Sequence, residues 1–325
     1  MMDKFAGILE GWLAFPLRSG LFFWLGGLVG WLAHIIDWQA IEQLFSGASP
    51  KPASLVLVGW QPFWHWLTAL KPEYATLLFF SFLFLASLAA MLVKSMTTPT
   101  LKLLEGYGWP QWTIRKAFKQ KYEQQLYHLE EKRLSDGLNP AESRKYQKLD
   151  HKLMHLPEND ALMPTRLGNL LRSFEQKPQE RYGLDAIICW PRLWILLPAE
   201  LQTELTEARN AVNDAVQIWI WGVLFLVWTT WFWISGNWWS LFPPILVSIS
   251  VMAFAYYWML QAAMTYGQLV QSSFDMYRHS LYKALRWPLP QNPTEEIVQG
   301  KQLTAYLWRG VADNIIFSQE NNEDK

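Results

Sequence analysis

The chain contains sixty consecutive residues without a charged side chain, from residue 215 to residue 274. A Ser-Gly-Asn segment at 235–237 and a Pro-Pro pair at 243–244 interrupt this run near its middle. A bilayer core about 30 Å thick requires about 20 apolar residues of helix to cross it. The run therefore predicts two membrane spans joined by a turn, at about 216–234 and 241–260.

Two further uncharged segments have the length of a span. The first is 21–36, between Arg18 and Asp37, and the second is 75–93, between Glu73 and Lys94. Four spans result. The Trp-rich segment 53–70 is also uncharged, and it either lies in the membrane interface or forms a fifth span, which would move the amino terminus to the other side.

The overall composition does not show that charged and apolar residues lie in separate segments, because 28 basic residues balance 28 acidic ones. The 21 tryptophans suit a protein with much interfacial surface, where indole rings sit among lipid headgroups. We predict an all-α integral membrane protein, in which four transmembrane helices in two pairs flank a mainly helical cytoplasmic domain. The predicted parts are an amphipathic interfacial helix at 1–20, a first transmembrane pair at 21–94 with an extracytoplasmic segment at 37–74, a charged cytoplasmic domain at 95–214, a transmembrane hairpin at 215–262 and a cytoplasmic helical extension and tail at 263–325.

The distribution of Lys and Arg predicts the orientation. Residues 95–214 contain 17 of them, whereas 37–74 contains only Lys51 and Lys71. Because positively charged loops stay in the cytoplasm, the central domain is predicted to be cytoplasmic, and with four spans both termini are cytoplasmic too. The expected location is a plasma membrane.

The central domain is predicted to be helical. One helix covers 111–134, and a second begins after Asn139, which is placed as a cap with Glu142 three residues later. A short helix ending at Phe174, a polar break at 176–180 and a segment at 182–197 follow. Within the last segment, 186–189 is either a short buried strand or a helical turn, since periodicity does not separate the two.

A helix that begins after Pro198 is expected to run without interruption into the third span. Its apolar positions alternate spacings of four and three, which is the pattern of a coiled-coil seam. The seam positions are Leu201, Leu205, Ala208, Val212 and Ala215. The fourth span is expected to continue as a helix until Pro288. These two extensions pack either on each other or on copies from a neighbouring subunit. Small residues at Gly26 and Gly30 in the first span are candidate helix-packing positions.

The most distinctive stretch is 164–198, which contains the elements PTRLGN at 164–169, YGLDA at 182–186 and WPRLW at 190–194. These elements resemble a motif of uncharacterised bacterial integral membrane proteins of unknown function. The resemblance covers about a tenth of the chain. It implies a bacterial source, and with it a location in the bacterial inner membrane. It also implies a recurrent structural role, and it implies no activity.

Arginines and aromatic residues alternate along this stretch. Guanidinium groups stack on rings, pair with carboxylates and hold phosphates, so the stretch is a candidate site for an anion, for lipid headgroups or for a partner. The sharper alternative is a nucleotide or another anionic small molecule. The candidate residues are Arg166, Arg172, Arg181, Tyr182, Asp185, Trp190, Arg192 and Trp194.

Few residues suggest a catalytic or metal-binding role. His151 and His155 share a helical face and are either metal ligands or part of a solvated surface. No phosphate-binding loop, dinucleotide fingerprint or nucleophile elbow occurs in the sequence. We therefore expect no catalytic residue, no cofactor and no metal.

Two functions remain open at this stage. The first is a non-enzymatic membrane scaffold or assembly protein whose cytoplasmic domain binds a partner or signal. The second is a homo-oligomeric pore gated by that domain, as in a membrane effector of a bacterial defence or stress system. Membrane lipids and a protein partner, or self-association through the cytoplasmic helices, are expected. A small-molecule ligand is possible in either case, and nucleic acid is not expected.

Overall fold

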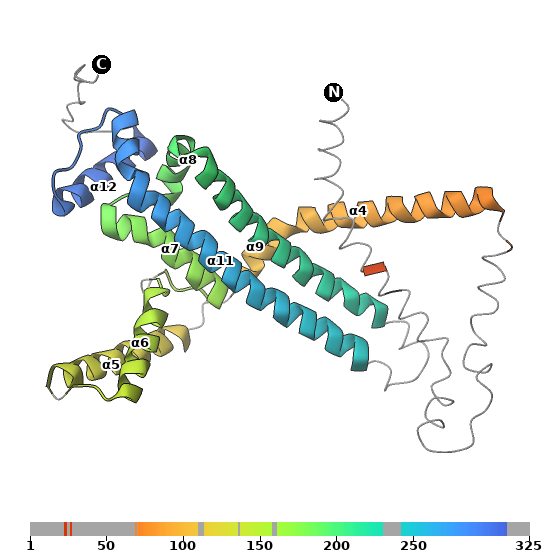
Figure 1. Cartoon of the computed structure of the whole chain (residues 1–325), viewed down its shortest axis with the longest axis horizontal. Helices are drawn as coiled ribbons and strands as arrows, with labels where there is room; N and C mark the ends of the chain where they lie inside the picture. The colour runs from red at the N-terminus through yellow and green to blue at the C-terminus, as the bar shows by residue number, and fades with distance from the viewer. Residues whose placement is uncertain are drawn as a thin grey trace. The chain divides into compact units, whose positions relative to one another are not determined.

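The computed structural model describes residues 23, 24, 27, 69, 71–109, 114–135, 137–157, 161–229 and 242–310. Throughout this described part the chain forms helices and turns, without a strand (Figure 1). The prediction of an all-α chain is confirmed for these residues.

Three of the described helices are long and apolar enough to cross a membrane. They are α4 (Pro72–Glu105), α9 (Ala199–Phe225), which continues as a short 3-10 helix η3 (Leu226–Trp228), and α11 (Phe242–Ala284). The predicted second span lies within α4, the third span begins within α9, and the fourth is covered by α11 from residue 242. The predicted helix at 1–20, nearly all of the first span, the Trp-rich segment and the 235–237 turn lie outside the described residues.

The chain divides into two compact units. Unit 1 consists of residues 1–100 and 214–257, and unit 2 consists of 101–213 and 258–325. The uncharged run therefore contributes to both units, because α11 belongs to unit 1 up to Tyr257 and to unit 2 from Trp258 onward.

Small residues allow close helix contacts in unit 1. A Cβ atom added to Gly222 of α9 would press against Met252 of α11, and the Ser248 hydroxyl donates a hydrogen bond to the Gly222 carbonyl. Gly27 lies against the Trp228 ring in the same way. The predicted packing glycines Gly26 and Gly30 lie outside the described residues. Close packing of small residues thus operates between the third and fourth predicted spans.

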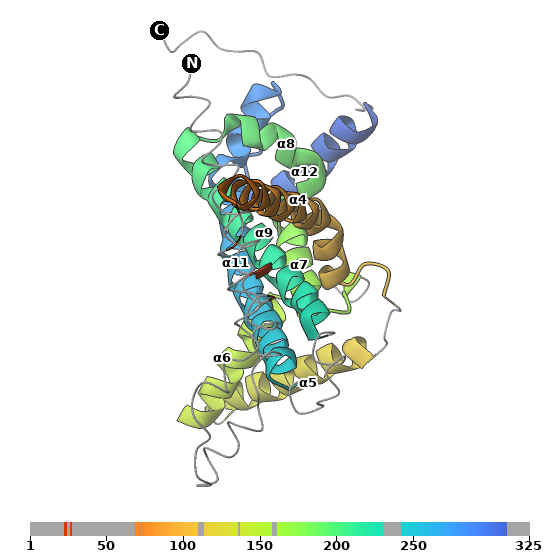
Figure 2. The ribbon, with the colours of Figure 1, turned by 90° about the vertical axis from the view of Figure 1, so that its right-hand side faces the viewer.

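Unit 2 contains α5 (Ile114–Ser135), α6 (Pro140–Met154), α7 (Arg166–Tyr182), α8 (Ala186–Leu196) and α12 (Pro293–Arg309), together with parts of α4, α9 and α11. Helix α12 packs against α7 and α8, and Figure 2 shows it beside α8. One buried hydrophobic cluster of this unit, which we call the unit 2 core, consists of Leu184, Ala186, Cys189, Leu193, Leu197, Leu205, Phe274, Leu281, Tyr282, Trp287 and Leu303.

The predicted polar break at 176–180 is wrong. Helix α7 continues through this segment to Tyr182, with Pro178 inside it. Pro178 is buried, so its ring contributes packing that offsets the hydrogen bond it cannot donate. The helix ends instead at Gly183, whose φ of +71° is a left-handed conformation that glycine adopts without strain.

The open alternatives for two other segments are resolved. Residues 186–189 form the first turn of α8 and are not a strand. Two positions of the predicted seam in α9, Leu205 and Val212, are fully or almost fully buried within the chain itself. Leu205 shares the unit 2 core with Phe274 and Leu281 of α11, so this part of the seam packs inside the monomer.

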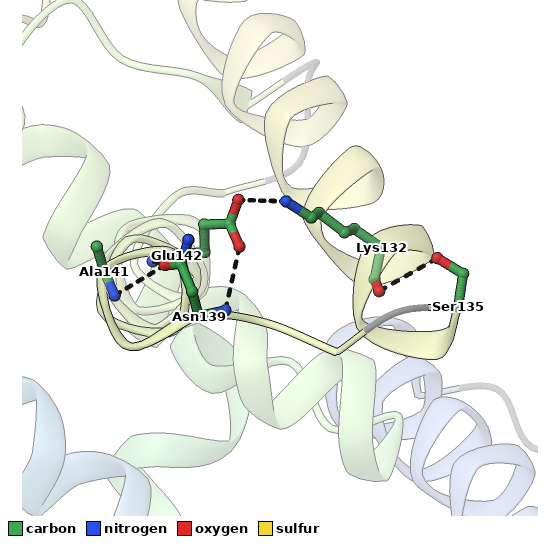
Figure 3. Close-up of polar contacts among 5 residues, drawn as sticks. All are labelled: Lys132, Ser135, Asn139, Ala141 and Glu142. Atoms are coloured by element: carbon green, nitrogen blue, oxygen red, sulfur yellow. Dashed lines mark hydrogen bonds and ion pairs between the residues drawn. The ribbon is translucent and has the colours of Figure 1, made fainter.

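Helices α5 and α6 form a hairpin, and its turn is held by side chains (Figure 3). The Asn139 side chain accepts hydrogen bonds from the backbone N–H groups of Ala141 and Glu142, while the Glu142 carboxylate accepts one from the Asn139 backbone. This is the predicted capping box, and it is confirmed. Glu142 also pairs with Lys132 of α5 at 2.5 Å, so one carboxylate caps α6 and joins it to α5.

Replacement of Asn139 by alanine should destabilise the start of α6 by about 1 kcal/mol, because two N–H groups lose their acceptor. Faster hydrogen exchange of the Ala141 and Glu142 amides would report the loss. Gln147→Ala, at an exposed position in the middle of the same helix, is the matched control and should leave those amides unchanged. Equal exchange in the two variants would contradict the cap.

The protection of the hairpin turn should also depend on pH. The hydrogen bond from Lys132, followed by that from the Asn139 backbone, lowers the pKa of Glu142. A lowered folded pKa means that the stabilisation is complete above the pKa of the unfolded chain and disappears as pH falls through the folded value. Hydrogen exchange at the start of α6 should therefore accelerate in acid, and Glu142→Gln should remove this pH dependence. An unchanged pH profile in that variant would contradict the assignment.

Candidate functional site

The PTRLGN element joins the start of α7 to the end of α4. Thr165 is the N-cap residue of α7, and its hydroxyl accepts a hydrogen bond from the Gly168 N–H at 3.0 Å. The same hydroxyl donates at 2.7 Å to the carbonyl of Glu105, the last residue of α4. A single side chain therefore satisfies one free donor of α7 and one free acceptor of α4.

Asn169 stabilises the same contact between α4 and α7 from the interior of the protein. Its side-chain oxygen accepts from the Met163 N–H at 2.7 Å, and its amide nitrogen donates to the carbonyls of Met163 at 3.0 Å and Thr165 at 2.9 Å. Only 3% of Asn169 is exposed. A buried side-chain amide with this number of bonds fixes the path of the chain into α7, because each bond lost would leave a buried polar group unpaired.

Gly168 allows the two helix ends to approach. A Cβ atom at this position would overlap the Glu105 carbonyl oxygen, which is a backbone atom and cannot rotate away. On the other side of the junction, Gly106 lies against Pro164 and has a φ of +98°. We call this contact, formed by residues 105–106 and 163–169, the α4–α7 junction.

The YGLDA element forms the turn between α7 and α8. Asp185 is the N-cap residue of α8 and accepts from the Ile188 N–H at 3.1 Å. The Asp185 backbone N–H donates to the Thr304 hydroxyl of α12, and that hydroxyl donates to the Gly183 carbonyl. Thr304 thus binds both sides of the turn.

Two glycines let α12 lie directly on this turn. A Cβ atom at Gly300 would overlap the Tyr182 carbonyl oxygen, and one at Gly183 would overlap the Ile297 carbonyl oxygen. The contact is therefore backbone against backbone from both sides. We call residues 182–186 with the facing part of α12 the α7–α8–α12 junction.

Charged groups surround the Tyr182 side chain. Its hydroxyl donates to Asp275 of α11 at 2.6 Å, and the Arg278 guanidinium lies over its ring, 4.1 Å from the centroid. Arg278 in turn pairs with Glu296 of α12 at 2.7 Å. Burial, followed by the hydrogen bond to Asp275, raises the pKa of Tyr182, so the phenol stays a donor at neutral pH. The cluster links α7, α11 and α12.

The WPRLW element lies in α8. Trp190 contacts the rings of Trp194 and Phe274, each with centroids 5.9 Å apart. Leu193 is fully buried, while Arg192 faces outward and donates to the Ile188 carbonyl. One side of α8 is thereby fixed in the core, and the other side is presented to the surroundings.

The structure does not gather the predicted arginines into one cluster. Arg166 and Arg181 are at opposite ends of α7, about 22 Å apart at 1.5 Å per residue. Arg172 pairs with Glu175 at 3.2 Å, and Arg181 lies 3.8 Å from Asp275. Asp185 is occupied as a helix cap. The proposed use of these residues for an anion stays a prediction.

Sequence reasoning missed Arg278, the arginine whose guanidinium lies over the Tyr182 ring of this stretch. Arg278 is the first basic residue after the uncharged run, three positions past Asp275. This spacing places both residues on one face of α11, the face that also carries the buried Leu281. The signal was present in the sequence, but the partner Tyr182 lies 96 residues earlier and spacing could not identify it.

The structure brings His151 and His155 together. Their Nδ1 atoms are 3.2 Å apart, and His155 Nδ1 lies 2.6 Å from the His151 carbonyl oxygen. Burial lowers the pKa of His155. Within the described ranges, no group of three His, Cys, Asp or Glu residues converges as a metal site.

Cys189 should report the integrity of unit 2. Burial raises the pKa of its thiol to about 11, so little thiolate exists at pH 8, and the side chain is fully buried. Maleimide labelling should therefore be slow in the folded protein and fast in denaturant. A cysteine placed by Ile187→Cys, two residues away and exposed, should react at once. Rapid labelling of Cys189 in the folded wild type would contradict the described core.

No family model, curated protein or solved structure matches the chain.

Proposed function

We propose that the chain is a non-enzymatic membrane scaffold whose domain at 95–214 binds a protein partner through the outward face of α8. Ile187, Pro191 and Ile195 lie on this face at intervals of four residues, and Arg192 borders it. Ile187 is 65% exposed and Ile195 is 76% exposed. An apolar stripe held in place by a buried opposite side is typical of a protein interaction surface.

The rigidity of α8 supports this assignment. Cys189 and Leu193 are completely buried on its inner side, and Asp185 caps its first turn. The α7–α8–α12 junction fixes the start of the helix through Gly183. A partner that binds a preformed face loses less conformational freedom than one that must order its target.

A charged helical segment separates α8 from the predicted third span along the chain. Helix α9 begins at Ala199, three residues after α8 ends, and it is uninterrupted to Asn213. These fourteen steps of helix correspond to about 21 Å. The uncharged run begins only after Asp214. The face of α8 is therefore connected to the predicted span through a charged helical segment of that length.

The proposal includes a location. Four spans in a bacterial inner membrane, with 95–214 and both termini in the cytoplasm, agree with the 17 Lys and Arg residues of the central domain. Membrane-impermeant labelling of cysteines introduced at Lys148 and Lys51 tests this topology in intact cells. Labelling at Lys51 only is expected, and labelling at Lys148 would overturn the orientation.

The partner is tested by crosslinking in native membranes. A photoreactive amino acid at Ile195 of the full-length chain should give one discrete protein adduct. The same amino acid at Gln179, exposed on α7, is the matched control and should give none.

Substitutions at the face provide the second part of this test. Arg192→Ala and Ile187→Asp should reduce the adduct, whereas Arg166→Ala, an exposed arginine at the far end of α7, should not. A lipid adduct at Ile195, or equal adducts at Ile195 and Gln179, would overturn the proposal.

A homo-oligomeric pore is the second candidate, and α4 is the observation that favours it. Most large apolar side chains of α4 are exposed, and an open groove along one face is lined by Glu73, Thr76, Ser81 and apolar neighbours. Copies of α4 could meet along this groove. Native mass spectrometry in nanodiscs separates the two candidates, because a closed ring with ion flux in liposomes supports the pore and a monomer without flux supports the scaffold.

A further inference from the structure

One face of α6 carries a continuous basic surface. At 100° per residue, Arg144, Lys145, Lys148 and Lys152 fall within an arc of about 100° around the helix axis. All four are exposed. We call these residues the α6 basic face.

The acidic residues of α6 do not neutralise this face. Glu142 is occupied by Lys132 and by the Asn139 cap. Asp150 points about 120° away from Arg144, the nearest member of the arc. In the part of the chain that the structure describes, none of the four basic residues forms an ion pair with Asp or Glu.

The hairpin holds this face outward. Leu129 of α5 and Leu149 of α6 are its buried residues, and Arg133 lies over the Tyr146 ring at 5.7 Å. Lys119 of α5 donates to the Pro157 carbonyl just beyond α6. Lys152 is 5.2 Å from the Tyr122 ring centroid and remains exposed at its end of the arc.

We propose that the α6 basic face binds the anionic surface of the lipid bilayer. These four exposed cations, none of which is in an ion pair among the described residues, complement a layer of anionic headgroups. The arc contains no large apolar residue that would insert between acyl chains. The candidate span α4 directly precedes this hairpin in the chain, so a bilayer containing the protein is present at high local concentration. An acidic protein partner is not held near the hairpin in this way, because it is not part of a bilayer that the same chain spans. The inference rests on the proposed membrane location.

Fluorescence transfer from the hairpin to labelled headgroups tests this inference. The full-length protein is placed in nanodiscs of phosphatidylcholine alone or of phosphatidylcholine mixed with phosphatidylglycerol. Cys189, the single cysteine, is buried, so an introduced cysteine can be labelled selectively. Ala141→Cys lies exposed within the arc, and Gln147→Cys lies exposed outside it as the matched control.

If the α6 basic face binds the bilayer, fluorescence transfer from Ala141→Cys should be stronger in the anionic nanodiscs than in the neutral ones. The change at Gln147→Cys should be smaller. Added salt should abolish the difference, because screening shortens the range of the attraction. Each charge removed by R144Q, K145Q, K148Q or K152Q should weaken docking about fivefold. Lys121→Gln, an exposed lysine of α5, should have a smaller effect, and Lys148→Arg should retain docking.

Equal transfer in neutral and anionic nanodiscs would overturn the inference. Fluorescence transfer that persists at high salt would also overturn it. Binding of an acidic protein to the α6 basic face in detergent without lipid would overturn it as well. These outcomes leave the crosslink at Ile195 unaffected, so failure of this inference is distinguishable from failure of the scaffold proposal.

Discussion

Replacement of Gly300 by alanine is expected to destabilise unit 2 by about 3 kcal/mol. In an open helix this substitution would be favourable, since alanine has the higher helix propensity. Here the new methyl group overlaps the Tyr182 carbonyl oxygen, and the other close atoms are also backbone. Helix α12 must therefore move away from the turn, and the bonds of Thr304 to Asp185 and Gly183 are lost with it.

The labelling rate of Cys189 measures this effect in the full-length protein, because the thiol is buried beside Thr304. Gly300→Ala should accelerate labelling about 100-fold at neutral pH, which corresponds to about 3 kcal/mol when opening and closing are fast relative to the labelling step. Lys301→Ala, at the exposed neighbouring position, is the matched control and should leave the rate unchanged. A wild-type rate in Gly300→Ala would show that α12 does not lie on the turn.

Replacement of Asn169 by leucine should destabilise the α4–α7 junction by about 2 kcal/mol or more. Leucine has the same branching at Cγ as asparagine but lacks its polar atoms, so the buried polar groups of the junction lose hydrogen bonds. The N–H and the carbonyl of Met163 lose their partner inside the protein, and each costs about 1 kcal/mol or more. The Thr165 carbonyl loses one of its two bonds but still accepts from the backbone N–H of residue 169.

Hydrogen exchange of the Met163 and Gly168 amides and the thermal midpoint of the purified protein check this expectation. Asn169→Asp keeps an acceptor for the Met163 N–H but places a carboxylate against two carbonyls, so it should also destabilise. Arg166→Ala is the control within the same element, because its side chain is exposed and takes no part in the hydrogen bonds of Thr165 and Asn169. If Asn169→Leu and Arg166→Ala behaved alike, the described role of Asn169 would be wrong.

Local patterns predicted the helices well where they carried their own signals. The Asn139 cap with Glu142 defined the start of α6, and the apolar spacing after Pro198 defined α9. The same approach misjudged α7, because the polar residues around Pro178 resemble a break when their burial is unknown. Residues 186–189 could not be assigned, since a short apolar run fits a strand or a helix until its neighbours are known.

The sequence identified the elements PTRLGN, YGLDA and WPRLW. The prediction assigned a binding role to their arginines and gave no structural role to their small residues. Thr165, Gly168 and Asn169 carry the α4–α7 junction, and Gly183 carries the second one. Their importance comes from backbone atoms that lie close in space. The arginines, by contrast, are mostly exposed and are spread along α7 and α8.

The sequence alone determined that this is a helical chain with apolar segments of membrane-spanning length, because charge and hydropathy act through local composition. It also determined the caps that begin α6, since their groups are within four residues of each other. Only the tertiary structure decided that Gly300 meets Tyr182 and that Arg278 covers the same tyrosine. These contacts join residues about a hundred positions apart, and only packing of α7, α11 and α12 around one core brings them within reach.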